Sequence, residues 1–108
     1  MPRTDALQGA LPLLVLTLLA RRGPLHGYAI ATQIEALHDV LRVEEGSLYP
    51  ALHRMEESGW VRARWSKTES KRRARTYDIT AAGRRQLEAE VGEWKRISVA
   101  IAMALQAT

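Results

Sequence analysis

The sequence predicts a mainly α-helical protein with one small β-hairpin, and three patterns in its 108 residues support this fold class. Apolar residues recur at helical spacing in four segments. Two short segments rich in β-branched and aromatic residues enclose a polar stretch that can turn. Lysine and arginine gather around that turn. A chain of this length is expected to form one domain with a single modest core.

The first helix is expected over residues 11–22, after an arm formed by residues 1–9. Leu13, Leu16 and their neighbours make this helix apolar on every side, so it must be buried on every side. One domain of this size cannot cover such a helix completely, and a second subunit is the natural cover. Pro12 fits only in the first helical turn, where its missing N–H would be unpaired in any case.

Gly23 and Pro24 end this helix, and a second helix is expected to begin near His26. Its residues at spacings of four, three and four predict one buried stripe. That stripe consists of Ile30, Ile34, Leu37 and Leu41.

A third helix is expected after a turn at residues 43–46, and Ser47 or a residue just before it should cap the helix. Pro50 would then lie in the first turn, where it costs little. Residues at i, i+3, i+4 and i+7 predict one buried face and one presented face. The buried face consists of Leu48, Ala51, Leu52 and Met55.

Residues 60–67 and 73–79 are expected to pair as a β-hairpin across the polar turn 68–72. Trp60 and Trp65 lie on opposite faces of their strand, so one is expected in the core and the other half-exposed. A basic run is usually a solvated loop, but directly after an amphipathic helix it favours phosphate binding. This arrangement is that of a winged helix-turn-helix. The run holds seven of the sixteen basic residues: Arg62, Arg64, Lys67, Lys71, Arg72, Arg73 and Arg75.

Thr80 is expected to cap a last helix that ends near Gln106. Its apolar residues form a heptad seam, whereas packing on its own domain would need a broader stripe. We therefore predict a winged helix-turn-helix domain over residues 1–79 and a C-terminal dimerisation helix over residues 80–108, packed on the same unit. The expected dimerisation residues are Leu13, Leu16, Leu87, Val91, Trp94, Ile101 and Leu105, with Ser98 as the polar member of the seam.

Several kinds of chemistry find no support in the sequence. The absence of cysteine excludes disulfides and thiolate metal sites. His26, His38 and His53 lie on different predicted elements without a second ligand nearby, so no metal or other cofactor is expected. The apolar run 11–20 is shorter than the roughly 20 residues that cross a bilayer. We find no catalytic constellation and expect a soluble, cytoplasmic protein that is not an enzyme.

Three stretches of the chain resemble the PadR-type family of bacterial transcriptional regulators. They are HGYAI at residues 26–30, EEGSLYPALHRMEESGWV at 44–61 and SKRRARTYDITAAGRRQL ending at residue 87. The resemblance implies a winged helix-turn-helix that binds DNA and dimerises through its last helix. It also implies that an aromatic residue at the position of Trp94 lines a pocket for a small flat aromatic effector at the dimer centre. A tryptophan that simply fills the interface is the alternative.

The presented face of the third helix supplies the candidate contacts to double-stranded DNA. Arg54 can donate a pair of hydrogen bonds to a guanine edge or to a phosphate. Tyr49 could instead pack its ring against the second helix, and Tyr28 could fill the core rather than bind a phosphate. The full set of expected DNA contacts is Tyr28, Ser47, Tyr49, Pro50, His53, Arg54, Lys67, Lys71, Arg72, Arg73 and Arg75.

Two functions of different classes follow from these patterns. The first is a sequence-specific transcriptional regulator, expected to be a repressor, that binds a pseudo-palindromic operator as a homodimer. The alternative is a winged-helix module that binds another protein, with the basic hairpin contacting an acidic partner. Phosphate contacts make DNA affinity fall steeply with salt, and that dependence distinguishes the two.

Overall fold

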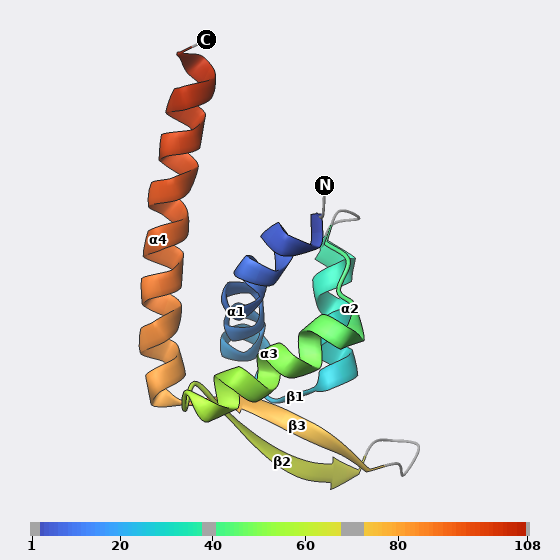
Figure 1. Ribbon diagram of the computed structural model, residues 1–108. Coiled ribbons are helices and arrows are strands. Elements are labelled where there is room, and N and C mark those ends of the chain that lie inside the picture. The colour runs from blue at the N-terminus through green and yellow to red at the C-terminus, as the bar shows by residue number, and fades with distance from the viewer. Residues whose placement is uncertain (1–2, 38–40, 68–72, 108) are drawn as a thin grey trace.

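The computed structural model describes residues 3–37, 41–67 and 73–107, which form a mainly helical fold with a small antiparallel sheet. Three helices gather above the sheet, and a fourth extends away from them (Figure 1). The expected fold class is therefore confirmed. The helices are α1 Arg3–Arg22, α2 Gly27–Leu37, α3 Glu45–Glu57 and α4 Ala81–Gln106; the strands are β1 Leu25–His26, β2 Val61–Lys67 and β3 Arg73–Ile79.

The sheet has the strand order β1-β3-β2 and is antiparallel throughout. β2 and β3 form the expected hairpin, in register from Val61 opposite Ile79 to Lys67 opposite Arg73. β1 was not predicted from the sequence, because two residues between helices carry no periodic signal. Its His26 lies opposite Thr76 of β3, so the segment before α2 is attached to the wing.

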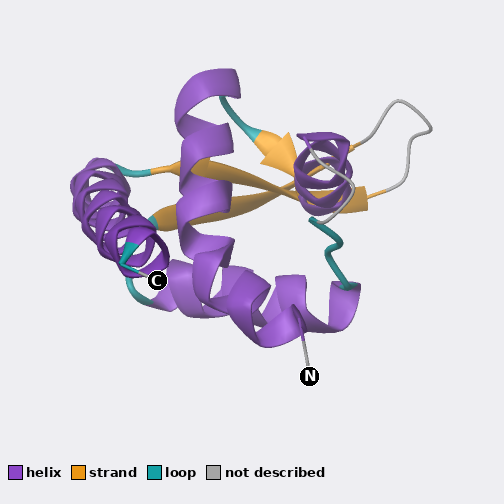
Figure 2. Cartoon of the chain, turned by 90° about the horizontal axis from the view of Figure 1, so that it is seen from above, coloured by secondary structure: helices purple, strands orange, loops and turns teal. Residues whose placement is uncertain are grey.

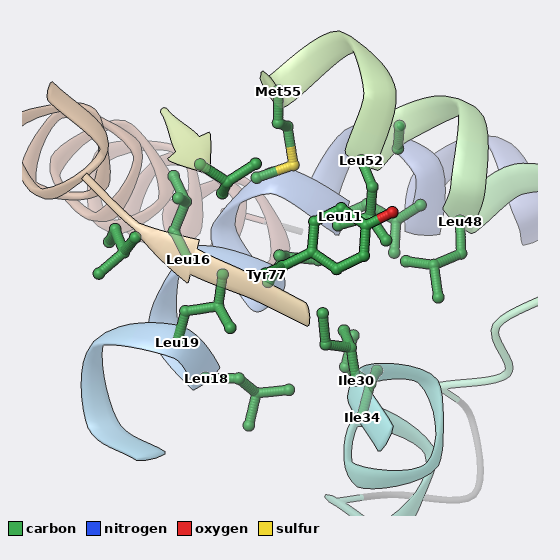
Figure 3. Packing of buried hydrophobic residues seen from close by; sticks show 14 of the residues in the cluster. Leu11, Leu16, Leu18, Leu19, Ile30, Ile34, Leu48, Leu52, Met55 and Tyr77 are labelled. Atoms are coloured by element: carbon green, nitrogen blue, oxygen red, sulfur yellow. The ribbon is translucent and has the colours of Figure 1, made fainter. Parts of the chain in front are cut away.

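The core lies where α1, α2 and α3 meet the inner face of the sheet (Figure 3). The predicted stripe of α3 is buried in full. In α2 the stripe is only partly correct, because Ile30 and Ile34 are buried whereas Leu37, the last residue of the helix, is exposed. Leu41 packs against the core from the segment before α3.

α1 differs from the sequence-based expectation at both its start and its proline. The helix begins at Arg3, so the expected N-terminal arm is helical from that residue on. Pro12 lies at the tenth helical position, not in the first turn. A proline there removes one main-chain hydrogen bond and bends the helix. α1 indeed changes direction along its length (Figures 1 and 2).

The apolar surface of α1 is largely covered within the chain itself. Leu11, Val15, Leu16, Leu18 and Leu19 are all buried. The expectation that one winged domain cannot cover this helix is therefore wrong for most of its surface, because α2, α3, α4 and β3 all contact it.

The start of α3 also differs from its prediction. The helix begins at Glu45, after the N-cap residue Glu44, whose side chain makes no capping hydrogen bond. Ser47 is the third helical residue, and its main-chain N–H donates to the Glu44 carbonyl at 3.0 Å. Pro50 is the sixth helical residue and thus lies in the second turn. The capping role assigned to Ser47 and the position assigned to Pro50 are both wrong.

The start of α4 is fixed against the base of the hairpin. As predicted, Thr80 caps the helix: its Oγ1 accepts a hydrogen bond from the Gly83 N–H at 3.0 Å and donates one to the Gly59 carbonyl at 2.5 Å. A β-carbon at Gly83 would lie only 2.1 Å from the Trp60 carbonyl oxygen, so only glycine fits there. Beyond this contact α4 runs beside α1 and then past it (Figure 1).

Candidate nucleic-acid interface

The presented face of α3 carries the polar side chains expected from the sequence. Pro50, His53 and Arg54 are exposed, and Ser47 is partly exposed. Packing of the opposite stripe on the core fixes which way this face points. The His53 Nε2 lies 3.6 Å from the Glu57 carboxylate, one helical turn further on.

Two tyrosines lie where α2 and α3 approach each other. A β-carbon at Gly27, the first residue of α2, would lie 2.7 Å from Cε1 of Tyr49. The Tyr49 ring therefore packs against α2, yet 40% of the residue stays exposed. Tyr28 is exposed rather than part of the core, and its ring stacks on His26 with centroids 5.7 Å apart.

A short polar chain joins the three strands and supports this corner. Ser66 on β2 shares a hydrogen bond with Thr76 on β3, and the Thr76 Oγ1 lies 3.2 Å from the His26 Nδ1 on β1. Thr76 is a buried polar residue, and these partners satisfy its hydroxyl. These hydrogen bonds, together with the stacking of the Tyr28 ring on His26, fix Tyr28 relative to the wing.

The wing carries exposed cations at the described ends of its strands. Lys67 and Arg73 are exposed and lie opposite each other. The Arg73 guanidinium lies 4.9 Å from the ring centroid of Trp65, a cation–π contact that restricts this side chain. Trp65 is exposed and Trp60 packs against the core, as predicted. The expected contacts Lys71 and Arg72 lie outside the described residues.

Arg75 differs from the other predicted DNA contacts because it has a partner within the chain. Its Nη2 donates to the Glu56 Oε2 of α3 at 3.0 Å. The two side chains are 36% and 31% exposed, so the pair is half-buried. The structure thus places Arg75 in an ion pair between wing and helix rather than on a free cationic surface. Sequence reasoning missed Glu56, since nothing in the local pattern pairs it with a residue nineteen positions away.

Tyr77 lies within the core (Figure 3), and the Arg75 guanidinium lies 6.0 Å from the centroid of its ring. Burial raises the pKa of its hydroxyl above the usual value, while the nearby positive charge of Arg75 lowers it and Glu56 and Tyr49 raise it. The burial effect is the largest, so the phenol stays neutral. Glu56 of α3, Arg75 of the wing and Tyr77 of the core therefore lie close together.

The predicted dimerisation residues fall into three groups. Leu16 is fully buried in the core of its own chain, and Leu87 packs against that core. Leu13 and Val91 are partly buried, whereas Trp94, Ile101 and Leu105 are exposed. Leu16 therefore has no surface to offer to a partner.

Trp94 lines a pocket of about 250 Å³ between α1 and α4. Leu13 and Ile97 form part of its apolar wall, and Glu90 and Glu93 also line it.

In the described parts of the chain no group of three or more histidine, aspartate or glutamate side chains could hold a metal ion. None of the described helices is both long enough and apolar enough to cross a membrane.

Comparison with known proteins identifies the family. Residues 15–89 match the model of the transcriptional regulator PadR-like family. The chain belongs to this family. A transcriptional regulator from Clostridium thermocellum is 29% identical, with a TM-score of 0.81 over 92% of this chain and 96% of that one. A PadR family transcriptional regulator from Eggerthella lenta is 27% identical, with a TM-score of 0.81 over 97% and 89% of the two chains.

A protein encoded in a transposon of Streptomyces fradiae is also similar. It is 45% identical over 86 residues, which make up 80% of this chain but only 23% of that protein. Family and fold together make this chain a winged-helix, DNA-binding transcriptional regulator.

Proposed function

We propose that this PadR-like protein is a sequence-specific repressor that binds a pseudo-palindromic operator as a homodimer. The observation that carries the proposal is the exposed polar face of α3 together with the exposed cations Lys67, the last residue of β2, and Arg73, the first residue of β3. α3 would enter the major groove, and the wing would hold the adjacent phosphates.

The apolar residues exposed on α4 support the dimer. Ile101 and Leu105 belong to the heptad seam and are 54% and 71% exposed in the single chain. Two copies of α4 would cover them. Because a two-fold dimer presents two identical copies of α3, its operator would have matching half-sites. Repression would need only stable occupancy of that operator.

A small flat aromatic effector remains part of the proposal. The pocket beside Trp94 offers an exposed indole ring on which such a molecule could stack, and it lies on the helix that would form the dimer. Binding there would act at the proposed dimer interface.

Selection of bound fragments from the source genome tests the proposal first, because it yields the operator. The cognate-to-random affinity ratio is then compared for the wild type and Arg54→Ala. If Arg54 makes a bidentate base contact, its loss should remove about 1–3 kcal/mol of discrimination. A phosphate contact would weaken both duplexes alike.

Arg96→Ala is the matched control for this experiment. Arg96 is an exposed arginine on α4, where it pairs with Glu93, so its removal changes the charge equally but leaves α3 untouched. Its affinity ratio should equal that of the wild type. If no genomic fragment binds and the protein instead captures an acidic protein, the interaction-module alternative replaces the proposal.

A further inference from the structure

We propose that Arg75, Glu56 and Trp65 form a brace that fixes the wing to α3 and helps to determine operator specificity. This inference rests on the proposed function, because specificity is measured on the operator. It assigns Arg75 a positioning role in place of the phosphate contact expected from the sequence. Glu56 and Trp65 acquire roles that the sequence did not indicate.

The geometry of the brace joins two elements that would contact different parts of the DNA. Glu56 lies in the last turn of α3, and Arg75 lies in β3, opposite Trp65 of β2. The Arg75 guanidinium donates to Glu56 at 3.0 Å and lies 5.7 Å from the Trp65 ring centroid. It also lies 6.0 Å from the ring centroid of Tyr77. A planar guanidinium can stack on a ring while it donates to a carboxylate, which an ammonium cannot do equally well.

The contacts of Arg75 differ from those of its neighbour Arg73. Nε of Arg75 is buried, and no acceptor in the described parts of the chain contacts it. Two nitrogens of this guanidinium, the buried Nε and the Nη2 bound to Glu56, are therefore not available to DNA. Arg73 stacks on the same Trp65 ring but remains exposed at the end of its strand. Two cations on one ring repel each other, and the Glu56 carboxylate offsets this repulsion by neutralising Arg75.

The brace would act on specificity rather than on the number of phosphate contacts. Base edges are read only when α3 lies at one angle and depth in the groove, whereas phosphates can be contacted in many orientations. A wing fixed to α3 makes both sets of contacts compatible with a single orientation. Without the brace, the wing would still bind phosphates but would no longer favour the orientation that reads the bases.

The first test compares Glu56→Gln with Glu57→Gln. The two substitutions remove the same charge from adjacent positions, but Glu57 is paired with His53 rather than with the wing. We expect Glu57→Gln to raise affinity for cognate and random duplexes by similar factors. Glu56→Gln should lower the cognate-to-random ratio on the order of threefold to tenfold. Equal ratios in the two variants would overturn the brace.

The second test separates positioning from phosphate contact through the salt dependence. Arg73→Gln should reduce the slope of log affinity against log salt by about one, because it removes one phosphate contact. Arg75→Gln should keep the wild-type slope and lower the affinity ratio, and Arg75→Lys should retain more of that ratio. In the double variant Glu56→Gln with Arg75→Gln, the ratio should fall no further than in either single variant. A slope reduced by one in Arg75→Gln would make Arg75 a phosphate contact instead.

A third measurement needs no DNA and so separates this inference from the proposed function. Amide hydrogen exchange in β2 and β3 of the free protein should be faster in Glu56→Gln than in the wild type, and unchanged in Glu57→Gln. If the wild type binds no operator but this difference is found, the proposed function fails together with the specificity role, whereas the link between the wing and α3 stands. If the operator is bound but exchange is the same in all three proteins, the brace fails alone.

Discussion

The winged unit, residues 3–79, and the distal half of α4 differ in how they bury apolar side chains. Leu16 and Leu52 in the winged unit are fully buried within the single chain. Ile101 and Leu105 in α4 are more than half exposed, and so is Trp94. The first region is therefore complete in one chain. A monomer rarely exposes so many neighbouring apolar groups as the second region does, which supports the proposed dimer.

The two regions differ in how much they support a dimer. The apolar character of α1 suggested a partner, but the chain itself covers most of that helix. The heptad seam of α4 begins at Leu87, which packs on the same core, and only its later members are exposed. The support for a dimer therefore comes from the far half of α4.

The largest effect is expected at Ile101, an exposed member of the α4 seam. Ile101→Lys would bury an unpaired charge in the proposed interface, at a cost on the order of several kcal/mol. The subunits should separate while the winged unit stays folded. Light scattering gives the mass, and circular dichroism reports the fold.

Met103→Lys is the control for this change. Met103 is also exposed, but it lies on the opposite side of the heptad from the seam. The substitution Met103→Lys should leave the dimer intact. A wild type that is monomeric at tens of micromolar, or equal effects of the two lysines, would show that the seam is not the interface.

A smaller effect is expected at Leu16, which the sequence assigned to the interface and the structure assigns to the core. Leu16→Ala should lower the free energy of unfolding by about 2–5 kcal/mol, because it leaves a cavity. The dissociation constant of the dimer should not change. Leu105→Ala should do the opposite, weakening the dimer without altering the winged unit. Sedimentation and urea unfolding over a range of protein concentrations separate the two outcomes.

The smallest effect concerns the pH dependence of the winged unit. Burial raises the pKa of Tyr77 in the folded protein, so the folded state keeps this proton to higher pH than the unfolded state does. The stability that Tyr77 contributes is present below the unfolded pKa of about 10 and is lost as pH rises towards the folded value. Tyr77→Phe should flatten the decline in stability above about pH 10.

Tyr28→Phe is the control for the pH experiment, because Tyr28 is exposed. Urea midpoints between about pH 9 and pH 11 provide the measurement. If the stability of Tyr77→Phe falls with rising pH as steeply as that of the wild type, other groups cause the alkaline loss of stability.

The parts of the fold that were predictable are those with a periodic pattern or a specific capping residue. The stripe of α3, the two hairpin strands and the Thr80 cap are of this kind. The start of α1, the short strand β1 and the positions of Pro12 and Pro50 were not predictable. They depend on contacts with the rest of the fold, which can override local preference.

The candidate site divides in the same way. The exposed face of α3 follows from helical geometry once its buried stripe is known. The partner of Arg75 does not, since an ion pair between β3 and α3 depends on how those elements pack. Charge alone made Arg75 and Arg73 look equivalent, and only their contacts distinguish them.

The close approach of Gly83 to the Trp60 carbonyl makes α4 a lever with a fixed pivot. Its 26 residues span about 39 Å, so a tilt of about 10° at the pivot would move the far end by roughly 7 Å. That displacement corresponds to about two base-pair steps along the duplex. In the proposed dimer, the close packing that glycine allows at the pivot would therefore help to hold the operator half-site spacing that the two copies of α3 can match.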